Sequence, residues 1–267
     1  TASSVTTPKA APTTASGQVL NARADTVDFR DLMFTPTLAE VPQTRPLDDY
    51  LAHKVPILDQ GTEGACTGFG LATVVHYLLN TRKHWPDNTT VSPRMLYDMA
   101  RRYDEWEGTS YSGSSCRGAM KGWQKHGVCT ETRWPYLPGT APNAPAEALT
   151  NDRATDAVGR PLGAYFRVNH RDVVSMHTAI AEVGVVYVSC VVHEGWSRVK
   201  SDGVIVPGGK TLGGHAFAVV GYDAHGFWFQ NSWGKTWGRE GFGHLRYDDW
   251  LENATDAWVA RLGAPIQ

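Results

Sequence analysis

The sequence predicts an α+β protein in which a helix-rich first half precedes a strand-rich second half. Apolar residues recur at helical spacing after Cys66, whereas short apolar runs bounded by turn residues predominate after about Gly163. No internal repeat interrupts this order. Hydrophobic residues make up 42% of the 267 residues and charged residues 19%, which is typical of a globular protein and argues against a disordered or fibrous chain.

The N-terminal region is predicted to have two parts. Residues 1–24 are expected to be a disordered tail or linker, because Thr1 to Gln18 are rich in Thr, Ala, Ser and Pro and have almost no large apolar side chains to bury. Residues 25–47 carry Phe29, Leu32 and other apolar residues among prolines, and we expect them to form an extended strap that packs onto the rest of the protein. Because the sequence starts without Met, the lack of a signal peptide says little about compartment; a secreted or exported location is favoured over a cytoplasmic one.

Four helices are expected. The first runs from Cys66 to about Arg82 as an amphipathic helix, and the second follows Ser92 as N-cap and Pro93 as first helical residue. A third covers 115–126, with Gly127 as its C-terminal glycine, and a fourth covers 173–182. Strands are expected over 164–168, 185–192, 204–206, 215–222, 226–231 and 241–247.

The charge and apolar patterns exclude several classes of function. The formal net charge is −2 and no block of Lys or Arg is present, so we expect no nucleic-acid partner. The longest apolar runs, such as 183–192, are too short to span a bilayer, so we expect no membrane span. We also expect a monomer without a metal ion or cofactor.

Cys66 is a candidate nucleophile because it stands directly before or at the start of a predicted helix. A helix N-terminus stabilises the thiolate, which is the reactive form of cysteine, and its backbone N–H groups can help to hold an oxyanion. Gly61 and Gly64 allow a tight approach to this point, and Gln60 supplies a side-chain donor six residues upstream. The alternative is a buried structural cysteine at a helix start.

His215 and Asn231 are candidate partners because each stands at the end of a predicted strand. An imidazole can take a proton from a thiol and return it to a leaving amine, and an amide oxygen can fix the imidazole by accepting its Nδ1–H. Trp233 could cover that bond and exclude water. Taken singly, His215 is more typical of a structural or surface histidine, and Asn231 is more typical of a residue in a hairpin turn.

Taken together, these motifs are specific. A Gln-Gly loop that ends in Cys66, a Gly-His-Ala sequence at His215 and an Asn-Ser-Trp-Gly sequence at Asn231 follow one another at separations of 149 and 16 residues. From about Asp25 to Leu262 the chain resembles the papain family of cysteine peptidases. The resemblance implies a helical left lobe (about 48–150), a β-barrel right lobe (about 151–267 plus the 25–47 strap), and a substrate cleft between them.

The resemblance also implies a role for each motif. Cys66 would attack the scissile carbonyl and form a thioester. His215 would pair with the Cys66 thiolate and protonate the leaving amine, while Asn231 would orient His215. Gln60 and the Cys66 N–H would bind the oxyanion. Residues Ser114, Ser115, Gly214 and Trp233 would bind a polypeptide substrate.

The chain departs from the family pattern at three places. Thr67 replaces the usual Trp after the nucleophile, Glu63 replaces a disulfide-forming Cys, and Ser114 and Ser115 replace glycines of the substrate-binding loop. These changes resemble the bacterial branch of the family. The family's long helical prosegment is not recognisable. For the other cysteines, buried reduced thiols are favoured, while one pair among three stays open: Cys116, Cys129 and Cys190.

Three functions remain in view. The first is a cysteine peptidase that hydrolyses peptide bonds. An amidase or transpeptidase would use the same acyl transfer with another acceptor. An inactive papain-like interaction module is the third, and the intact set of Cys66, His215, Asn231 and Gln60 argues against it.

Overall fold

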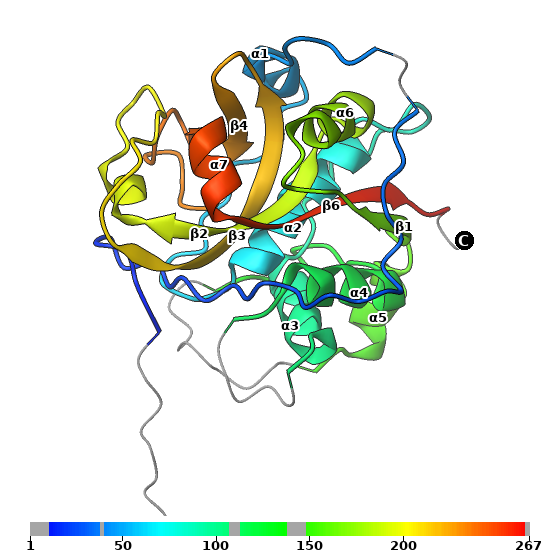
Figure 1. Ribbon diagram of the computed structural model, residues 1–267. Coiled ribbons are helices and arrows are strands. Elements are labelled where there is room, and N and C mark those ends of the chain that lie inside the picture. Colours follow the sequence, from blue (N-terminus) through cyan, green and yellow to red (C-terminus); the bar gives the residue numbers. More distant parts are fainter. Residues whose placement is uncertain (1–10, 38–39, 107–112, 138–147, 265–267) are drawn as a thin grey trace, which may run out of the picture.

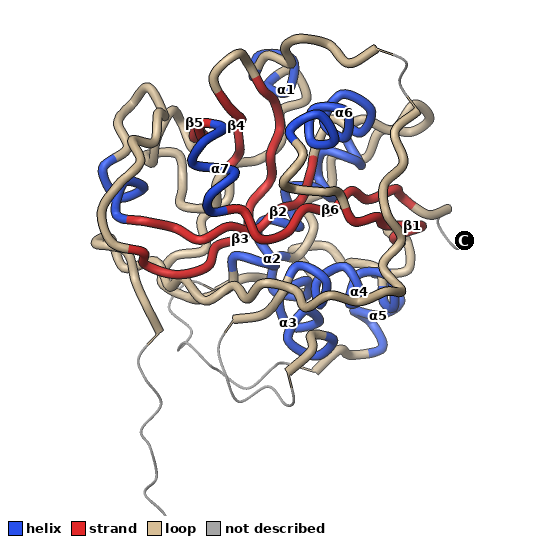
Figure 2. Tube along the Cα trace, viewed as in Figure 1, coloured by secondary structure: helices blue, strands red, loops and turns tan. Residues whose placement is uncertain are grey.

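The computed structural model describes residues 11–37, 40–106, 113–137 and 148–264. In Figure 1 a group of helices lies below a strongly twisted sheet, and further helices lie above that sheet. Figure 2 shows the same separation, with most helices of the first half on one side of the strands. The predicted α+β class with two lobes is confirmed.

Five helices precede the first strand in the described residues, and sequence signals at the ends of two of them explain where these begin. Ser92 accepts a hydrogen bond from Met95 N and Pro93 is the first residue of its helix, whereas Ser115 accepts from Gly118 N. The helix that Ser115 caps ends at Gly127, whose φ of 71° favours glycine. The five helices are α1 (Leu47–Leu51), α2 (Cys66–Asn80), α3 (Pro93–Tyr103), α4 (Cys116–His126) and α5 (Asn151–Ala157).

The second half forms a six-stranded sheet in which every neighbouring pair is antiparallel and the order is β1-β6-β2-β3-β4-β5. Among the described residues no pairing joins β1 to β5, so the expected β-barrel lobe is more accurately an open, twisted antiparallel sheet. The expected strand at 204–206 is wrong, since Val204 makes only an isolated bridge to His244. The strands are β1 (Leu162–Arg167), β2 (Val186–His193), β3 (Thr211–Tyr222), β4 (Gly226–Gln230), β5 (Phe242–Arg246) and β6 (Ala254–Leu262).

Helices cover both faces of this sheet. The period-two alternation of β3 turns Ala216, Ala218 and Val220 toward α2, and it turns Phe217 and Val219 toward the core on the other face. That second core includes α6 (Val173–Val183), which Asp172 caps, and α7 (Tyr247–Asn253). A short 3-10 helix, η1 (Glu194–Arg198), follows β2.

The central helix α2 is buried on nearly all sides rather than on one face, which corrects the expected amphipathic pattern. Gly68 and Gly70 explain how the neighbours come so close. A Cβ atom at Gly68 would overlap the backbone of Pro93 on α3, and one at Gly70 would lie 3.0 Å from Phe217 Cα on β3. The first residue of α2 is therefore held between the two lobes.

Residues 11–24 do not form the expected disordered tail, whereas residues 1–10 lie outside the described residues. Val19 bridges to Thr13, Asn21 bridges to Gly214, and the side chain of Leu20 is only 1% exposed. In Figure 1 this blue segment crosses the front of the molecule between the sheet and helices α3 and α4. Backbone pairing and one buried leucine hold it there, although its overall composition is that of a linker.

The strap that follows is described up to residue 37 and from residue 40, and it is held by charge rather than by the expected apolar packing. Phe29 is 100% exposed and Leu32 is 63% exposed. Backbone hydrogen bonds join Phe34 N to Arg167 O and Arg167 N to Leu32 O. Within residues 25–37 the apolar side chains, apart from the partly buried Phe34, therefore contribute little to the position of the strap, whereas Leu47 at its far end is buried in the core.

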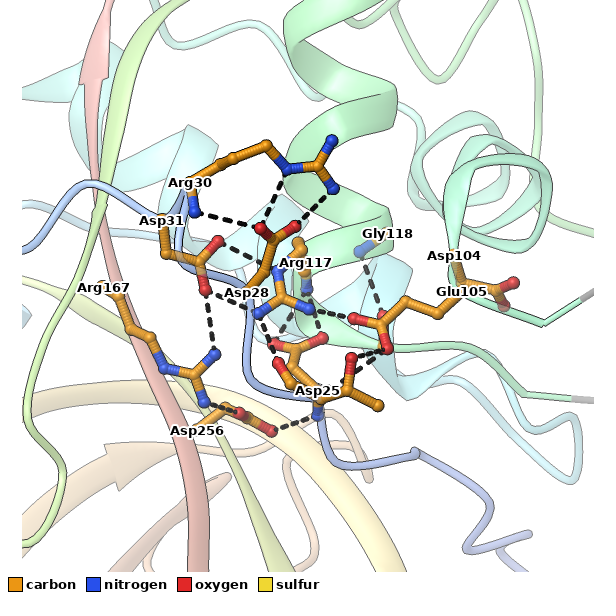
Figure 3. Close-up of polar contacts among 12 residues, drawn as sticks. Asp25, Asp28, Arg30, Asp31, Asp104, Glu105, Arg117, Gly118, Arg167 and Asp256 are labelled. Atoms are coloured by element: carbon orange, nitrogen blue, oxygen red, sulfur yellow. Dashed lines mark hydrogen bonds and ion pairs between the residues drawn. The ribbon is translucent and has the colours of Figure 1, made fainter.

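An ionic cluster fixes the start of the strap to both lobes (Figure 3). Arg117 of α4 is 1% exposed and donates to both carboxylate oxygens of Asp31 at 3.0 and 2.5 Å. The Arg117 backbone N–H donates to Asp25 at 3.0 Å. On the sheet side, Arg167 donates to Asp256 at 2.6 Å, and Asp256 accepts from Asp25 N at 3.1 Å. The chain just after residue 24 is thus tied to α4 and to β6 at once.

Candidate active site

Cys66 is the first residue of α2, as predicted, and its side chain has no exposed surface. The residue before the helix, Ala65, offers no side-chain cap, so the first backbone N–H groups of α2 have no capping side chain. Gln60 N donates a hydrogen bond to Ser232 O, and the next residue, Gly61, takes a φ of 59°, which favours glycine. This turn carries the chain from the β4 side of the sheet to the head of α2.

His215 and Asn231 come together as predicted, but through the other ring nitrogen. His215 lies on β3, and Asn231 follows β4, the neighbouring strand. The His215 Nε2 atom lies 2.8 Å from Asn231 Oδ1, whereas an Nδ1–H bond was expected. Among the described residues, the buried His215 Nδ1 has no hydrogen-bond partner. With Nε2 protonated, Nδ1 is left as a proton acceptor.

Two tryptophans lie beside His215, and a third packs against those two. The ring centroid of Trp233 lies 4.8 Å from that of His215, as expected for a residue that covers the His215–Asn231 bond. Trp196 lies 6.0 Å from His215, and Trp237 donates to the Trp196 carbonyl at 3.2 Å. Trp196 lies on η1, a short helix without apolar periodicity, so no sequence pattern indicated its role.

Burial shifts both candidate reacting groups toward their neutral forms. Burial raises the pKa of Cys66 to about 11, although nearby backbone N–H groups, first that of Ala216, act in the opposite direction. Burial lowers the pKa of His215 to about 4, against the hydrogen bond to Asn231. The thiolate–imidazolium pair implied by the family resemblance is therefore disfavoured in this covered form of the site.

Gln60 is fully buried and its amide is held at both ends. Its Nε2 donates to the Glu63 carbonyl at 3.0 Å, and its Oε1 accepts from Ser232 Oγ at 2.7 Å. An amide nitrogen carries two hydrogens, so the bond to Glu63 uses one and leaves the second.

The segment 19–23, called the covering segment below, lies over this site. Ala22 N donates to Gly214 O at 3.1 Å, and Arg23 N donates to Ser114 O at 3.0 Å. The bridges Asn21–Gly214 and Arg23–Ser115 are both parallel. The predicted substrate-binding backbone of Ser114 and Gly214 is thus already paired with the protein's own chain.

Side chains of the covering segment fill the space beside Cys66. A Cβ atom at either Gly64 or Gly113 would overlap Asn21, so both glycines leave room for that residue. Thr67, in place of the family's Trp, lies 2.5 Å from Ser114 through the two hydroxyl oxygens, and its carbonyl accepts from Tyr187. The Ser115 side chain is used as the cap of α4.

The remaining cysteines and metal-binding residues add no second reactive group. Cys116, Cys129 and Cys190 are all free and buried, which agrees with the expected reduced thiols. Across the described ranges, no group of three His, Cys, Asp or Glu side chains could hold a metal ion. No helix in this part of the chain is both long enough and apolar enough to cross a membrane.

Comparison with known proteins agrees with this geometry. The family model described as papain family cysteine protease matches residues 48–257. The "Gut-specific cysteine proteinase" of Caenorhabditis elegans is 27% identical over 77% of this chain and 69% of that protein.

Two solved structures extend the comparison. Xylellain, a cysteine protease from Xylella fastidiosa, superposes with a TM-score of 0.80 at 26% identity, over 98% of this chain and all of xylellain. This neighbour supports the expected bacterial type. Bromelain from Ananas comosus, with the E64 inhibitor, shares the fold with a TM-score of 0.64 at 22% identity, over 84% of this chain and all of bromelain. The chain belongs to the papain family of cysteine proteases and is a hydrolase of polypeptides.

Proposed function

We propose that the protein is a cysteine endopeptidase in which Cys66 is the nucleophile, His215 the acid and base, and Asn231 the residue that orients His215. One observation carries this assignment. The His215 Nε2 atom lies 2.8 Å from Asn231 Oδ1, and among the described residues the other ring nitrogen, Nδ1, has no hydrogen-bond partner. The residue after His215 on β3, Ala216, places its backbone N–H at the Cys66 thiol. A base so oriented can serve only through its free nitrogen.

The reaction follows from these positions. His215 Nδ1 takes the thiol proton, and Cys66 Sγ adds to the carbonyl carbon of the substrate. The second hydrogen of Gln60 Nε2 and the Cys66 N–H stabilise the oxyanion. His215 then gives its proton to the leaving amine as the C–N bond breaks and a thioester forms. Water, deprotonated by His215, attacks the thioester, releases the acid product and restores the Cys66 thiol.

For substrate binding, we propose that the backbone groups of Ser114, Ser115 and Gly214 pair with the substrate main chain. Support comes from the covering segment, which uses the Ser114 and Gly214 carbonyls as acceptors for its own N–H groups. Trp233, which packs on His215, would form the wall on the leaving-group side and keep water from the His215–Asn231 bond.

We further infer that the covering segment keeps the enzyme latent in this form. Cys66 and His215 have no exposed surface while the segment is in place, so a substrate cannot reach them. The Asn21 side chain fills the space between Gly64 and Gly113. The segment must leave before a polypeptide can bind, because both would use the same backbone acceptors.

The assignment is tested with an irreversible thiol-directed epoxide, which accumulates on Cys66 even when the covering segment leaves only rarely. The wild-type chain should be labelled at Cys66 and should cleave a fluorogenic peptide. Cys66→Ala should fold normally and show neither property. Cys129→Ala, which alters another buried free cysteine, is the matched control and should keep both. Wild-type turnover in Cys66→Ala would show that another residue is the nucleophile.

A further inference from the structure

The loop between Gln60 and Ala65, called the oxyanion loop below, presents a physical problem. It carries Gln60, and it leads directly into the Cys66 N–H, so its position decides whether both proposed oxyanion donors are in place. Two of its residues are Gly61 and Gly64, which leave the backbone more freedom than other residues. No disulfide restrains it, since all four cysteines are free.

One arginine contacts this loop from α3. Arg94 donates from Nη1 and Nη2 to the two carboxylate oxygens of Glu63, at 2.7 and 2.5 Å. The side chains of this ion pair are only 9% and 6% exposed. A bidentate pair of this kind fixes direction as well as distance, because both groups are planar.

The same guanidinium reaches the other end of the loop through an aromatic ring. The Arg94 Cζ atom lies 4.7 Å from the ring centroid of Tyr136, and the Tyr136 hydroxyl donates to the Gln60 carbonyl at 2.6 Å. The Gln60 side chain closes the ring of contacts by donating to the Glu63 carbonyl at 3.0 Å. Arg94 therefore touches Glu63 directly and holds Gln60 through one intermediate.

Helix stability explains only part of why an arginine stands here: Arg94 Nη1 lies 3.9 Å from Asp98 Oδ1 on the same helix, a longer contact than either bond to Glu63. Arg94 is the second residue of α3, where the helix dipole disfavours a positive charge. A buried ion pair is also weak evidence for stability, because well-packed apolar residues of similar volume often stabilise as much or more. The feature that the ion pair adds is a fixed geometry for Glu63 and, with it, for the loop.

We propose that Arg94 is a positioning residue for catalysis, which holds the oxyanion loop through Glu63 and Tyr136 and so keeps Gln60 Nε2 and the Cys66 N–H in register. This inference rests on the proposed roles of Gln60 and Cys66. Arg94 contacts no substrate and takes no part in bond making. The ion pair does by directed contacts what a covalent cross-link to residue 63 would otherwise do.

The test separates positioning from stability with three variants of the full chain. Arg94→Met leaves the Glu63 carboxylate buried and unpaired, so it should lower both Tm and kcat. Glu63→Met with Arg94→Met replaces the ion pair by an apolar pair and should recover part of the Tm. The recovery is partial because Asp98, 3.9 Å from Arg94, loses that contact in both variants. The kcat of the double variant should stay about 10- to 100-fold below wild type with KM changed less than about threefold, because donors that are misplaced act mainly on the transition state. Arg94→Lys keeps the charge and should recover part of the kcat.

Two controls keep the outcome interpretable. Arg133→Met removes an arginine of the same lobe whose ion pair with Asp152 is exposed, and it should change neither kcat nor Tm. Amide hydrogen exchange of the peptides covering 58–66 is read in parallel and needs no turnover. It should speed up in the double variant but not in Arg133→Met.

The inference is overturned if the double variant regains wild-type kcat together with its Tm, or if exchange of the 58–66 peptides is unchanged. Failure of the proposed function looks different. In that case wild type itself shows no epoxide labelling at Cys66, whatever the exchange of the loop.

Discussion

The covering segment makes a quantitative prediction through Leu20. Its side chain is 1% exposed and belongs to the core cluster that contains Trp196 and Phe217. Replacement of a buried Leu by Ala costs about 2–5 kcal/mol. We use the lower part of that range, about 2–3 kcal/mol, because the segment is short and can shift. When the segment leaves, Leu20 is exposed in wild type and variant alike, so this cost falls on docking of the segment and not on folding of the lobes.

The predicted effect on activity follows directly. Since about 1.4 kcal/mol is a factor of ten, Leu20→Ala should raise the undocked population by roughly 30- to 150-fold. The initial rate of peptide cleavage and the rate of epoxide labelling of Cys66 should both rise by that factor, or until undocking no longer limits them. Val27→Ala, in the adjoining strap where Val27 is 84% exposed, should match wild type. Equal rates for Leu20→Ala and wild type would refute the view that this segment controls access.

Three further predictions concern the same site. Asn231→Ala should lower kcat by roughly 10- to 100-fold but leave measurable turnover. The variant removes only the orientation of His215, whose own contribution as acid and base is about 10²–10⁴-fold. Turnover as low as that of Cys66→Ala would contradict a purely orienting role. Asp25 lies two residues after the covering segment, and burial, together with a neighbouring carboxylate, raises its pKa from 3.8 to about 7. The docked chain therefore holds a proton at Asp25 that the undocked chain releases between those values. Docking should weaken, and the ratio of wild-type to Asp25→Asn cleavage rates should rise, as pH increases from 3.8 to about 7, and the ratio should level off above that. A ratio that falls across this range would have the wrong sign. The Arg23 Cζ atom lies 4.6 Å from the centroid of the Trp106 ring, so cleavage of a peptide library should show a preference for a basic side chain at one subsite. Trp106→Ala should reduce that preference by about two- to fivefold. An unchanged cleavage profile would exclude the Trp106 ring as the subsite.

Much of the site could be predicted from sequence because its signals are local. Ser92 with Pro93 and Ser115 with Gly127 mark helix ends by their own backbone chemistry, and the structure confirms both helices. The head of α2 at Cys66 follows from apolar spacing after a glycine-rich turn. The meeting of two strand ends at His215 and Asn231 needs only that consecutive antiparallel strands are neighbours.

The features that were missed depend on contacts between distant segments. Composition predicts a disordered tail for residues 11–24, but backbone hydrogen bonds to Gly214 and Ser114, which composition does not report, hold this part of the chain in place. Apolar residues such as Phe29 suggested packing of the strap, whereas Arg117 holds the strap by charge. The choice of Nε2 over Nδ1 on His215 depends on ring orientation, which no sequence pattern encodes.

The sealed position of Cys66 also has a consequence for how the protein withstands oxidation. Oxidants attack a cysteine chiefly as the thiolate and in proportion to its exposure, and beyond the first step the products are not readily reduced. With its side chain fully enclosed and its pKa raised to about 11, Cys66 is kept as an unreactive thiol until the segment departs. The residues that keep substrate out would therefore also preserve the nucleophile during storage in an oxidising medium, so that the enzyme becomes vulnerable and active at the same moment.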